Sequence, residues 1–320
     1  MRAQAHGLHL VYPPISNQHA QWMEREEEIE SAMAKSNLYM IGHRAEARFA
    51  AIHFAKETGF FTGVFNVPGL EDCPFAINVG AIVEERDLPT YEVDAGSQHI
   101  RIWRVDGDDR TEVADWFTSE KLLYDKARGH PHVLGLERFR ELATYDLLYV
   151  GISKKGDSFR RLIKRPHAQR ARVLSSAHPK KAGARTTDEI VLFFFELRTT
   201  FLNAVSPTED DAARKLLDVT KDKLRTVADA EKALIRVLDP PYNEEKYTNY
   251  PRCTDGLYGQ GIDAYAYALA EDLTLKTAKR MLRGDRTFPE VGSSVDLISI
   301  QGDSLVVIEP DGTREELTRL

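Results

Sequence analysis

Cysteine is scarce in this chain of 320 residues, which contains only Cys73 and Cys253. The two lie far apart, and neither has a second ligand at a metal-binding spacing. Their number and placement exclude a disulfide framework and a zinc finger and favour a reducing compartment. Long apolar runs are also missing: residues 190–195 are too few to span a bilayer, and residues 1–11 lack the apolar core of a signal peptide. We therefore expect a cytoplasmic protein with no membrane partner.

An excess of positive charge is absent as well. The chain has 43 Lys and Arg against 50 Asp and Glu, a formal net charge of -7. This balance excludes a protein coated in basic residues for nucleic-acid binding, but it allows a local basic groove. With 42% hydrophobic and 29% charged residues the composition is that of a soluble globular protein. The length suits two domains or one elaborated domain, and no internal repeat or low-complexity linker marks a boundary.

A charged residue interrupts an otherwise apolar helical face near residue 231. Val227, Leu234, Ile235 and Leu238 recur at helical spacing, and Glu231 lies in the same stripe. A buried carboxylate costs several kcal/mol unless a cation, a metal or a hydrogen-bond donor meets it. Glu231 should therefore have a partner, either in a structural ion pair or in a functional site.

Two further signals flank this helix in the sequence. After it, two prolines at 240 and 241 stop the helix, and Asn243 follows directly. Before it, residues 147–153 predict a strand that places Tyr149, Gly151 and Ser153 on one face and apolar side chains on the other. Residues 157–162 could then open a helix that carries Arg160 and Arg161.

The stretch from residue 160 to residue 185 is basic throughout. It holds nine Lys and Arg and no Asp or Glu. In an acidic protein this asymmetry favours contact with a phosphate backbone, and a basic loop that balances acidic neighbours is the alternative. The predicted nucleic-acid contacts are Lys164, Arg165, Arg170, Arg172, Lys180 and Lys181.

The remaining pattern predicts the α/β class (α+β), with a small mixed β-sheet flanked by helices. The apolar run 190–195 suits a central strand buried on both faces. Further strands are expected at residues 61–67, 75–83, 100–105, 295–300 and 305–308, the last two as a hairpin. Helices are expected at residues 18–35, 43–57, 210–226 and 266–282, with helical patches within 111–141. The histidines of Gly129-His130-Pro131-His132 suit a turn better than a metal site.

Taken together, these residues resemble the GIY-YIG nuclease family. Tyr149-Val150-Gly151 looks like the second signature tripeptide, Arg161 or Arg160 like the arginine of the following helix, Glu231 like the metal-binding glutamate and Asn243 like the terminal asparagine. Between Glu231 and Asn243 lie Leu234, Ile235, Pro240 and Tyr242. The spacing of these six residues is similar to that in the nuclease domain of the bacterial excision-repair incision enzyme. The resemblance covers residues 147–243. Family members also place a histidine one turn after the arginine, and here His167 is the candidate.

The first signature strand of the family has no clean counterpart. Gly63-Val64-Phe65 and Ile100-Arg101-Ile102-Trp103 have a similar shape but end in Phe and Trp. Either this strand has diverged and is separated from the second by an insertion, or Tyr145 or another hydroxyl takes the place of the first tyrosine.

The resemblance implies a metal-dependent endonuclease that hydrolyses phosphodiester bonds, DNA rather than RNA, in antiviral defence or a mobile element. Glu231 would hold Mg²⁺, with Mn²⁺ as a substitute. The implied catalytic residues are Tyr149, Arg160, Arg161, His167, Glu231 and Asn243.

The expected organisation is an accessory α/β region at residues 1–98, a GIY-YIG-like core with an insertion at 99–250 and an accessory region at 251–320. A protein partner or a homo-oligomer remains open. Two other functions also remain open: a catalytically diverged nucleic-acid-binding module, and a structural or interaction protein whose basic surface docks onto an acidic partner.

Overall fold

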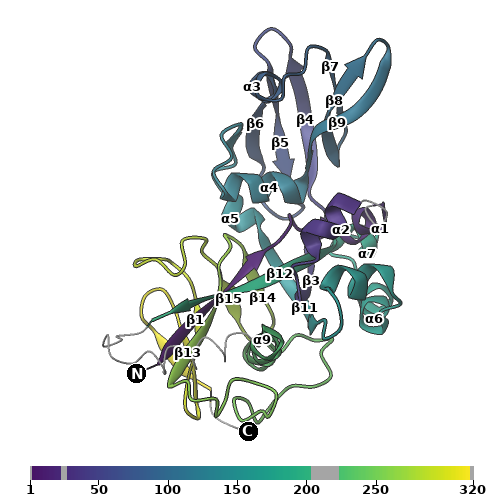
Figure 1. Ribbon diagram of the computed structural model, residues 1–320. Coiled ribbons are helices and arrows are strands. Elements are labelled where there is room, and N and C mark those ends of the chain that lie inside the picture. Colours follow the sequence, from purple (N-terminus) through teal and green to yellow (C-terminus); the bar gives the residue numbers. More distant parts are fainter. Residues whose placement is uncertain (1, 23–26, 203–222, 318–320) are drawn as a thin grey trace.

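One large mixed sheet organises the molecule. The computed structural model describes residues 2–22, 27–202 and 223–317, and within them the sheet has the order β15-β14-β11-β3-β12-β1-β13-β16-β17-β18, with β2 paired to β12 (Figure 1). Its strands are β1 (Ala3–Leu10), β2 (Ile15–Ser16), β3 (Leu38–His43), β11 (Thr144–Ile152), β12 (Ile190–Phe201), β13 (Ala264–Leu269), β14 (Thr274–Lys276), β15 (Met281–Arg283), β16 (Leu297–Gln301), β17 (Ser304–Ile308) and β18 (Arg314–Glu316). The expected mixed α/β class is confirmed, and the sheet is larger than expected.

The apolar run predicted as a central strand forms the start of β12. This strand lies between β3 and β1 and pairs antiparallel with both. Because side chains alternate along a strand, Phe193 and Phe195 join one apolar cluster while Leu192 and Phe194 join another on the opposite face. Both faces of this strand are therefore core, as the sequence predicted.

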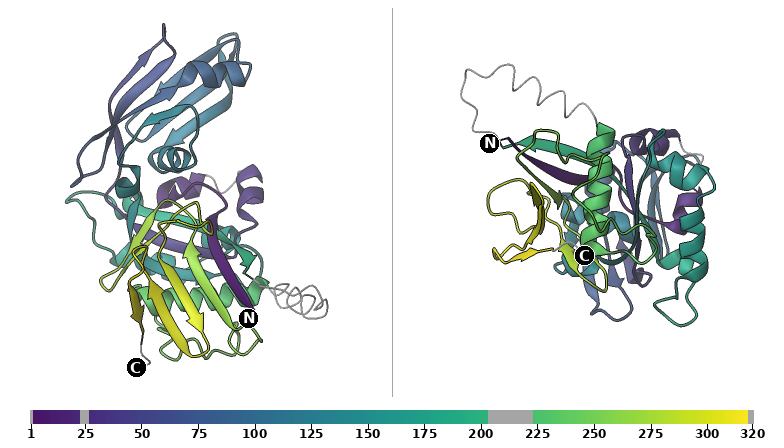
Figure 2. Two further views of the ribbon diagram at one scale, coloured as in Figure 1. Left: turned by 90° about the vertical axis from the view of Figure 1, so that its left-hand side faces the viewer. Right: turned by 90° about the horizontal axis from the view of Figure 1, so that it is seen from below.

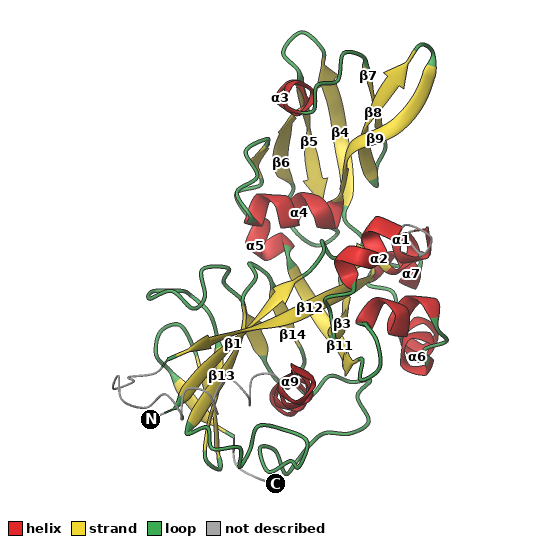
Figure 3. Cartoon of the chain, viewed as in Figure 1, coloured by secondary structure: helices red, strands yellow, loops and turns green. Residues whose placement is uncertain are grey.

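Helices cover both faces of the sheet near β3 and β11. Figure 3 shows α9 (Lys223–Leu238) on one side and a group of shorter helices gathered on the other. This group consists of α1 (Asn17–Trp22), α2 (Glu27–Met33), a single π-helical turn η2 (Arg160–Lys164), α6 (Ala168–Ser176) and α7 (Thr186–Glu189). The apolar face of α9, with Val227, Leu234, Ile235 and Leu238 buried, is confirmed.

A body of about one hundred residues separates β3 from β11. Residues 44–143, called the inserted region below, contain a four-stranded sheet and a three-stranded sheet (Figure 2). Buried side chains of both sheets belong to one apolar cluster. Its elements are β4 (Arg48–Ala55), β5 (Phe60–Asn66), β6 (Cys73–Asn78), α3 (Val79–Glu85), β7 (Tyr91–Ala95), β8 (His99–Asp106), β9 (Asp109–Thr118), α4 (Ser119–Ala127), β10 (Val133–Gly135) and α5 (Phe139–Leu142). The main sheet also takes strands from all three of the stretches expected as separate regions (1–98, 99–250 and 251–320).

Two predicted helices are wrong because a strand period was overlooked. Residues 43–57 form the end of β3 and the whole of β4, which pairs with β5 and turns Phe49 into the core. Residues 266–282 form β13, β14 and β15, where Tyr265 and Tyr267 alternate with alanines and face the main cluster. Tertiary strand pairing overrides the helical preference of alanine.

Other elements agree with the sequence in part. The hairpin of β16 and β17 is confirmed, with Gln301 paired to Ser304. The strand predicted at 75–83 ends at Asn78, whose side chain accepts a hydrogen bond from the Ala81 backbone and caps α3. The patch at 111–141 begins as strand β9 and then forms α4 and α5. The helix predicted at 210–226 lies largely outside the described residues.

Candidate active site

Strands β3 and β11 bring two tyrosines onto the same face of the sheet. Tyr39 lies opposite Gly151, and Tyr149 lies opposite Ile41. A bulge at Leu148 places that residue in the same apolar cluster as Tyr39, so the predicted alternation along β11 is wrong at this position. The rings of Tyr39 and Tyr149 are 6.2 Å apart between centroids, and the two side chains are hydrogen-bonded to each other.

Gly151 makes room for these two rings. A Cβ atom built at this position would lie 2.7 Å from Cε1 of Tyr149 and 2.7 Å from both Cζ and the hydroxyl of Tyr39. Such contacts are far shorter than van der Waals distances, so any side chain here would push the tyrosines apart. The glycine of the Tyr-Val-Gly tripeptide therefore has a packing reason in this fold.

His167 packs against both tyrosines. It caps the N-terminus of α6, and its Nδ1 accepts a hydrogen bond of 3.0 Å from the Arg170 backbone N–H. Its Nε2 lies 2.7 Å from the Tyr39 hydroxyl, and its ring is 6.0 Å from that of Tyr149. Burial, helped by Arg161 and Arg170, lowers the pKa of His167 to about 4.

These contacts fix the direction of a hydrogen-bond chain. A neutral imidazole whose Nδ1 is an acceptor carries its proton on Nε2, so Nε2–H donates to the Tyr39 oxygen. Because the Tyr39 oxygen accepts from His167, its own O–H is left to donate to Tyr149, its other hydrogen-bond partner. The helix cap therefore sets the tautomer of His167 and, through it, the order of donors that ends at the Tyr149 oxygen.

The two candidate arginines separate in space. Arg160 forms an ion pair with Glu30, with Nε at 2.8 Å from the carboxylate. Arg161 has no ion pair among the described residues, and its positive charge acts on Tyr39, Tyr149 and His167. Arg161 is therefore the arginine that the structure brings to the tyrosines, and Arg160 is engaged elsewhere.

Glu231 lies at the middle of α9, close to the end of β11. Burial raises the pKa of its carboxyl group to about 7, whereas Lys232, Lys154 and a hydrogen bond from the Ile152 backbone oppose the rise and Asp255 adds to it. Its negative charge reaches both Tyr39 and Tyr149. The partner expected for this buried carboxylate is therefore a set of nearby cations and a backbone N–H instead of one ion pair.

Asn243 and its neighbour close the outer edge of β11. The Asn243 carboxamide accepts from the Val150 N–H at 2.9 Å and donates to the Val150 carbonyl at 2.8 Å, and the Tyr242 N–H donates to the Leu148 carbonyl at 3.1 Å. Strand β14 pairs only with the first three residues of β11, so this edge has no strand partner further along. The spacing from Glu231 to Asn243 therefore places Glu231, on α9, near the end of β11, and Asn243, in the turn after α9, along the edge of the same strand.

Acidic residues form ion pairs with three of the six residues that were predicted to contact phosphate. Ion pairs join Lys164 to Glu30, Arg172 to Glu244 and Lys180 to Asp146. The Arg170 side chain donates to Asn17 and to the Leu162 carbonyl. Arg165 and the Lys181 side chain have no ion pair in the described part of the chain and are exposed.

Sequence reasoning did not name Tyr39, and the structure places Tyr145, one of its alternatives, away from Tyr149. The Tyr145 hydroxyl is buried with Glu120 and Arg44, at the base of the inserted region, and its ring packs on Phe193 in the core cluster away from Tyr149. The other alternative, a diverged first strand separated by an insertion, matches the position of β3. The apolar run Leu38–His43 around a tyrosine was the available signal.

Glu231 fits a hard divalent cation as a single protein ligand. No group of three or more His, Cys, Asp or Glu side chains at metal-binding distance occurs within residues 2–22, 27–202 and 223–317. Mg²⁺ commonly keeps several waters and binds through one or two carboxylates together with substrate phosphates. The Glu231 carboxyl, whose pKa is raised by burial, would gain a counter-charge from such a cation, which suits that mode. His132, which pairs with Glu85 at 2.8 Å, lies outside this site.

Comparisons with known proteins add no relative. No family model matches the chain, and no curated protein or solved structure matches it. None of the helices in the described ranges is both long and apolar enough to span a bilayer.

Proposed function

We propose that the protein is a metal-dependent endonuclease that hydrolyses phosphodiester bonds through a GIY-YIG-like site, acting on DNA. The observation that carries this proposal is the convergence of Tyr39, Tyr149, Arg161, His167 and Glu231 at the end of β11. Tyrosine, arginine, histidine and glutamate together supply proton handling, positive charge and a metal ligand. A structural ion pair alone would not require the two tyrosines and the histidine.

Tyr149 is assigned the role of orienting the attacking water. Burial raises the pKa of its hydroxyl, and the nearby Glu231 adds to the rise, so the resting side chain keeps its proton. The hydrogen bond from Tyr39 and the charge of Arg161 act in the opposite direction. The chain of donors from His167 through Tyr39 fixes the Tyr149 oxygen in one orientation before substrate arrives.

Two side chains of the protein, Arg161 and Glu231, act on the phosphate. Arg161 stabilises the negative charge that develops on the phosphoryl oxygens in the transition state. Glu231 would hold the divalent cation, which would neutralise charge on the scissile phosphate and assist the leaving oxygen. Asn243 acts through β11 as a positioning residue, since it contacts Val150 and none of the reacting atoms.

The experiment that tests this proposal compares wild type with Glu231→Ala on labelled single- and double-stranded DNA and RNA, in Mg²⁺, Mn²⁺ or EDTA. We expect metal-dependent cutting by wild type, no cutting by Glu231→Ala, and similar DNA binding by both. Glu290→Ala, which removes an exposed carboxylate remote from the site, is the matched control and should cut like wild type.

Retained cleavage by Glu231→Ala would contradict the proposed mechanism. Binding without any cutting by wild type would favour the diverged nucleic-acid-binding module. Neither binding nor cutting would favour the interaction protein, for which the ion pairs at Lys164, Arg172 and Lys180 give some support, because they show this stretch already balancing acidic neighbours.

A further inference from the structure

A second cleft lies where the inserted region meets the main sheet. It has a volume of about 650 Å³ and receives side chains from β1, β12, α4 and the loops at residues 35, 271 and 286. This volume lies in the range of pockets that hold small-molecule ligands. The lining differs from that of the candidate active site, because none of Tyr39, Tyr149, Arg161, His167 or Glu231 takes part.

Positive charge dominates the lining of this cleft. Four cationic side chains, Lys35, Arg128, Arg198 and Arg286, face two carboxylates, Glu196 and Glu271. Arg198 pairs with Glu196 and Arg128 with Glu271. Neither Lys35 nor Arg286 forms an ion pair within the described residues, although the charge of Arg286 acts on Glu271. Four cations against two carboxylates leave the cleft net positive in an acidic protein.

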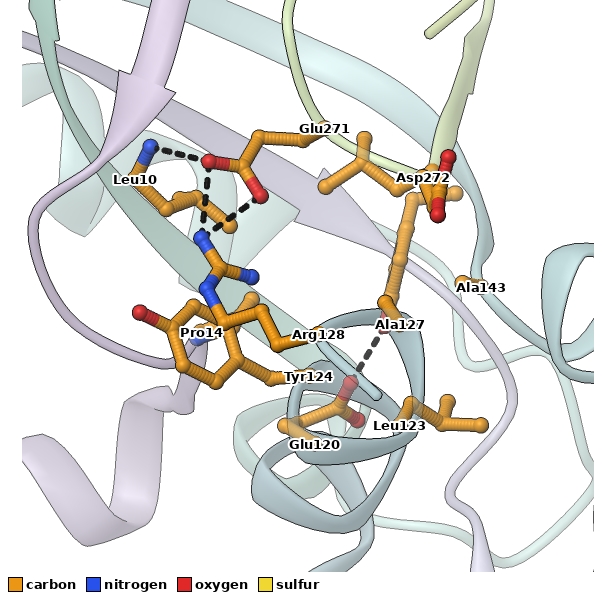
Figure 4. Close-up of a pocket in the computed structure, with 12 residues that line it drawn as sticks. Leu10, Pro14, Glu120, Leu123, Tyr124, Ala127, Arg128, Ala143, Glu271 and Asp272 are labelled. Carbon is orange, nitrogen blue, oxygen red and sulfur yellow. Dashed lines mark hydrogen bonds and ion pairs between the residues drawn. The ribbon is translucent and has the colours of Figure 1, made fainter. Parts of the chain in front are cut away.

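Arg128 is held rigidly at the inner wall. Its guanidinium lies 3.4 Å from the centroid of the Tyr124 ring, and its Nη2 contacts both oxygens of Glu271 at 2.9 and 2.8 Å (Figure 4). Glu271 also accepts from the Leu10 N–H at 2.8 Å. The Nε and Nη1 groups of Arg128 have no partner among the described residues, so a preorganised guanidinium presents unused donors in a partly buried position.

Arg286 also lines the cleft and adds to its positive charge. Its backbone N–H donates to Asp272 at 3.2 Å, and its Nη1 donates to the Ala127 carbonyl at the end of α4 at 3.1 Å. The side chain therefore links the loop after β15 to the inserted region. His9 at the same cleft stays neutral near pH 7, because burial and then Arg198 lower its pKa to about 4, so the cationic character comes from Lys and Arg alone.

We propose that this cleft binds a phosphate-bearing ligand, held by Arg128, Arg198 and Arg286 between the inserted region and the main sheet. Guanidinium groups match phosphate oxygens with paired, charge-assisted hydrogen bonds, and two arginines with spare donors suit a phosphate better than a single carboxylate. The same chemistry has two sources: a free nucleotide, or the backbone of a nucleic-acid strand that extends beyond the active site. A ligand here contacts both parts of the molecule and so resists their separation.

The test is direct binding in EDTA, so that no metal bridges the probe. Fluorescent ATP and a short labelled DNA strand are titrated with wild type, Arg198→Ala, Arg286→Ala and the control Arg314→Ala, an exposed arginine on β18. We expect saturable binding to wild type and the control, and an affinity roughly tenfold lower for each cleft variant, the loss typical of one charge-assisted contact. Arg198 is 64% exposed, so its removal leaves the fold intact, which thermal unfolding of the free variants verifies.

The two probes distinguish the sources. Binding of ATP that inorganic phosphate displaces and that the cleft variants weaken assigns the cleft to a nucleotide. Binding of the DNA strand that the cleft variants weaken, without binding of ATP, assigns it to a nucleic-acid backbone. Absence of saturable binding for both probes, or equal affinity in the cleft variants and wild type, would overturn the inference. The outcome is independent of cleavage, because the Glu231→Ala protein should bind both probes at this cleft as wild type does.

Discussion

The Tyr39 hydroxyl is the residue-scale feature on which the proposed chemistry depends. It accepts from His167 and donates to Tyr149, so Tyr39→Phe breaks the chain at its centre while keeping the ring. We expect cleavage to fall by roughly 10²- to 10⁴-fold, the range for loss of a group that handles protons in catalysis. Single-turnover cleavage rates measure this loss.

Tyr145→Phe is the matched control for this experiment. Its hydroxyl is buried with Glu120 and Arg44, away from Tyr149, so its removal should cost about 1–3 kcal/mol of stability and leave the cleavage rate of the folded protein unchanged. The reverse pattern, in which Tyr145→Phe abolishes cutting and Tyr39→Phe preserves it, would refute the assignment of Tyr39.

The sequence allowed Glu231 and Asn243 to be named as candidate site residues, but not Tyr39. Glu231 stood out because a charge lay in an apolar helical stripe, and Asn243 because it followed a helix stop. Tyr39 lacks a preceding glycine motif, and the inserted region separates it from Tyr149 along the chain. Only the register of β3 against β11 brings the two together, and no local pattern encodes a register between distant strands.

At the scale of elements, the turn after α9 acts as an edge strand for β11. Asn243→Asp keeps the acceptor for the Val150 N–H but replaces the donor to the Val150 carbonyl with a second oxygen. We expect a loss of about 1–3 kcal/mol in the free energy of unfolding, since a buried carbonyl is left unpaired. Urea denaturation measures it, and Asn249→Asp on the exposed part of the same segment should change stability little. Equal effects of the two substitutions would argue against the edge-closing role.

The elements differ in how far the sequence determines them. Strand β12 and helix α9 were predictable because each has an apolar pattern of one clear period and is buried accordingly. Strand β13 was not, because alternating alanine and tyrosine also satisfies a helical preference. Its parallel pairing with β1, at the opposite end of the chain, decides in favour of the strand.

At the scale of the whole molecule, one buried cluster joins the inserted region to the main sheet. Arg44 follows β3, Glu120 lies on α4 and Tyr145 opens β11, and the three side chains hydrogen-bond to one another with little exposure. The chain connects the inserted region to the main sheet at two places, near Arg44 and near Tyr145, and both of these side chains contact the Glu120 carboxylate. A ligand in the cationic cleft would add a second connection between the same parts, on the side of Arg128 and Arg286.

Three buried or half-buried histidines, two on β1 and one at the N-terminus of α6, lower the stability of the fold in mild acid. Burial lowers the pKa of His6 to about 4 from an unfolded value of 6.5, and the pKa of His9 and His167 falls to about 4 as well. Between pH 6.5 and 4 these histidines bind more protons in the unfolded chain than in the folded one, so their contribution to stability falls as the pH falls. Glu231, whose pKa in the folded protein is about 7, acts in the opposite direction. His6, stacked on Tyr267 with Nε2 unpartnered among the described residues, should account for roughly 3 kcal/mol of the loss.

His6→Phe isolates this contribution because the aromatic stack on Tyr267 is retained while the titrating group is removed. We expect the free energy of unfolding of this variant to fall less between pH 7 and pH 4.5 than that of wild type, as measured by urea denaturation at both values. His53→Phe, at an exposed position of β4, should keep the wild-type dependence. If His6→Phe and wild type lose the same free energy over this interval, His6 is protonated without cost in the folded state, and acid sensitivity must come from His9, His167 or the carboxylates.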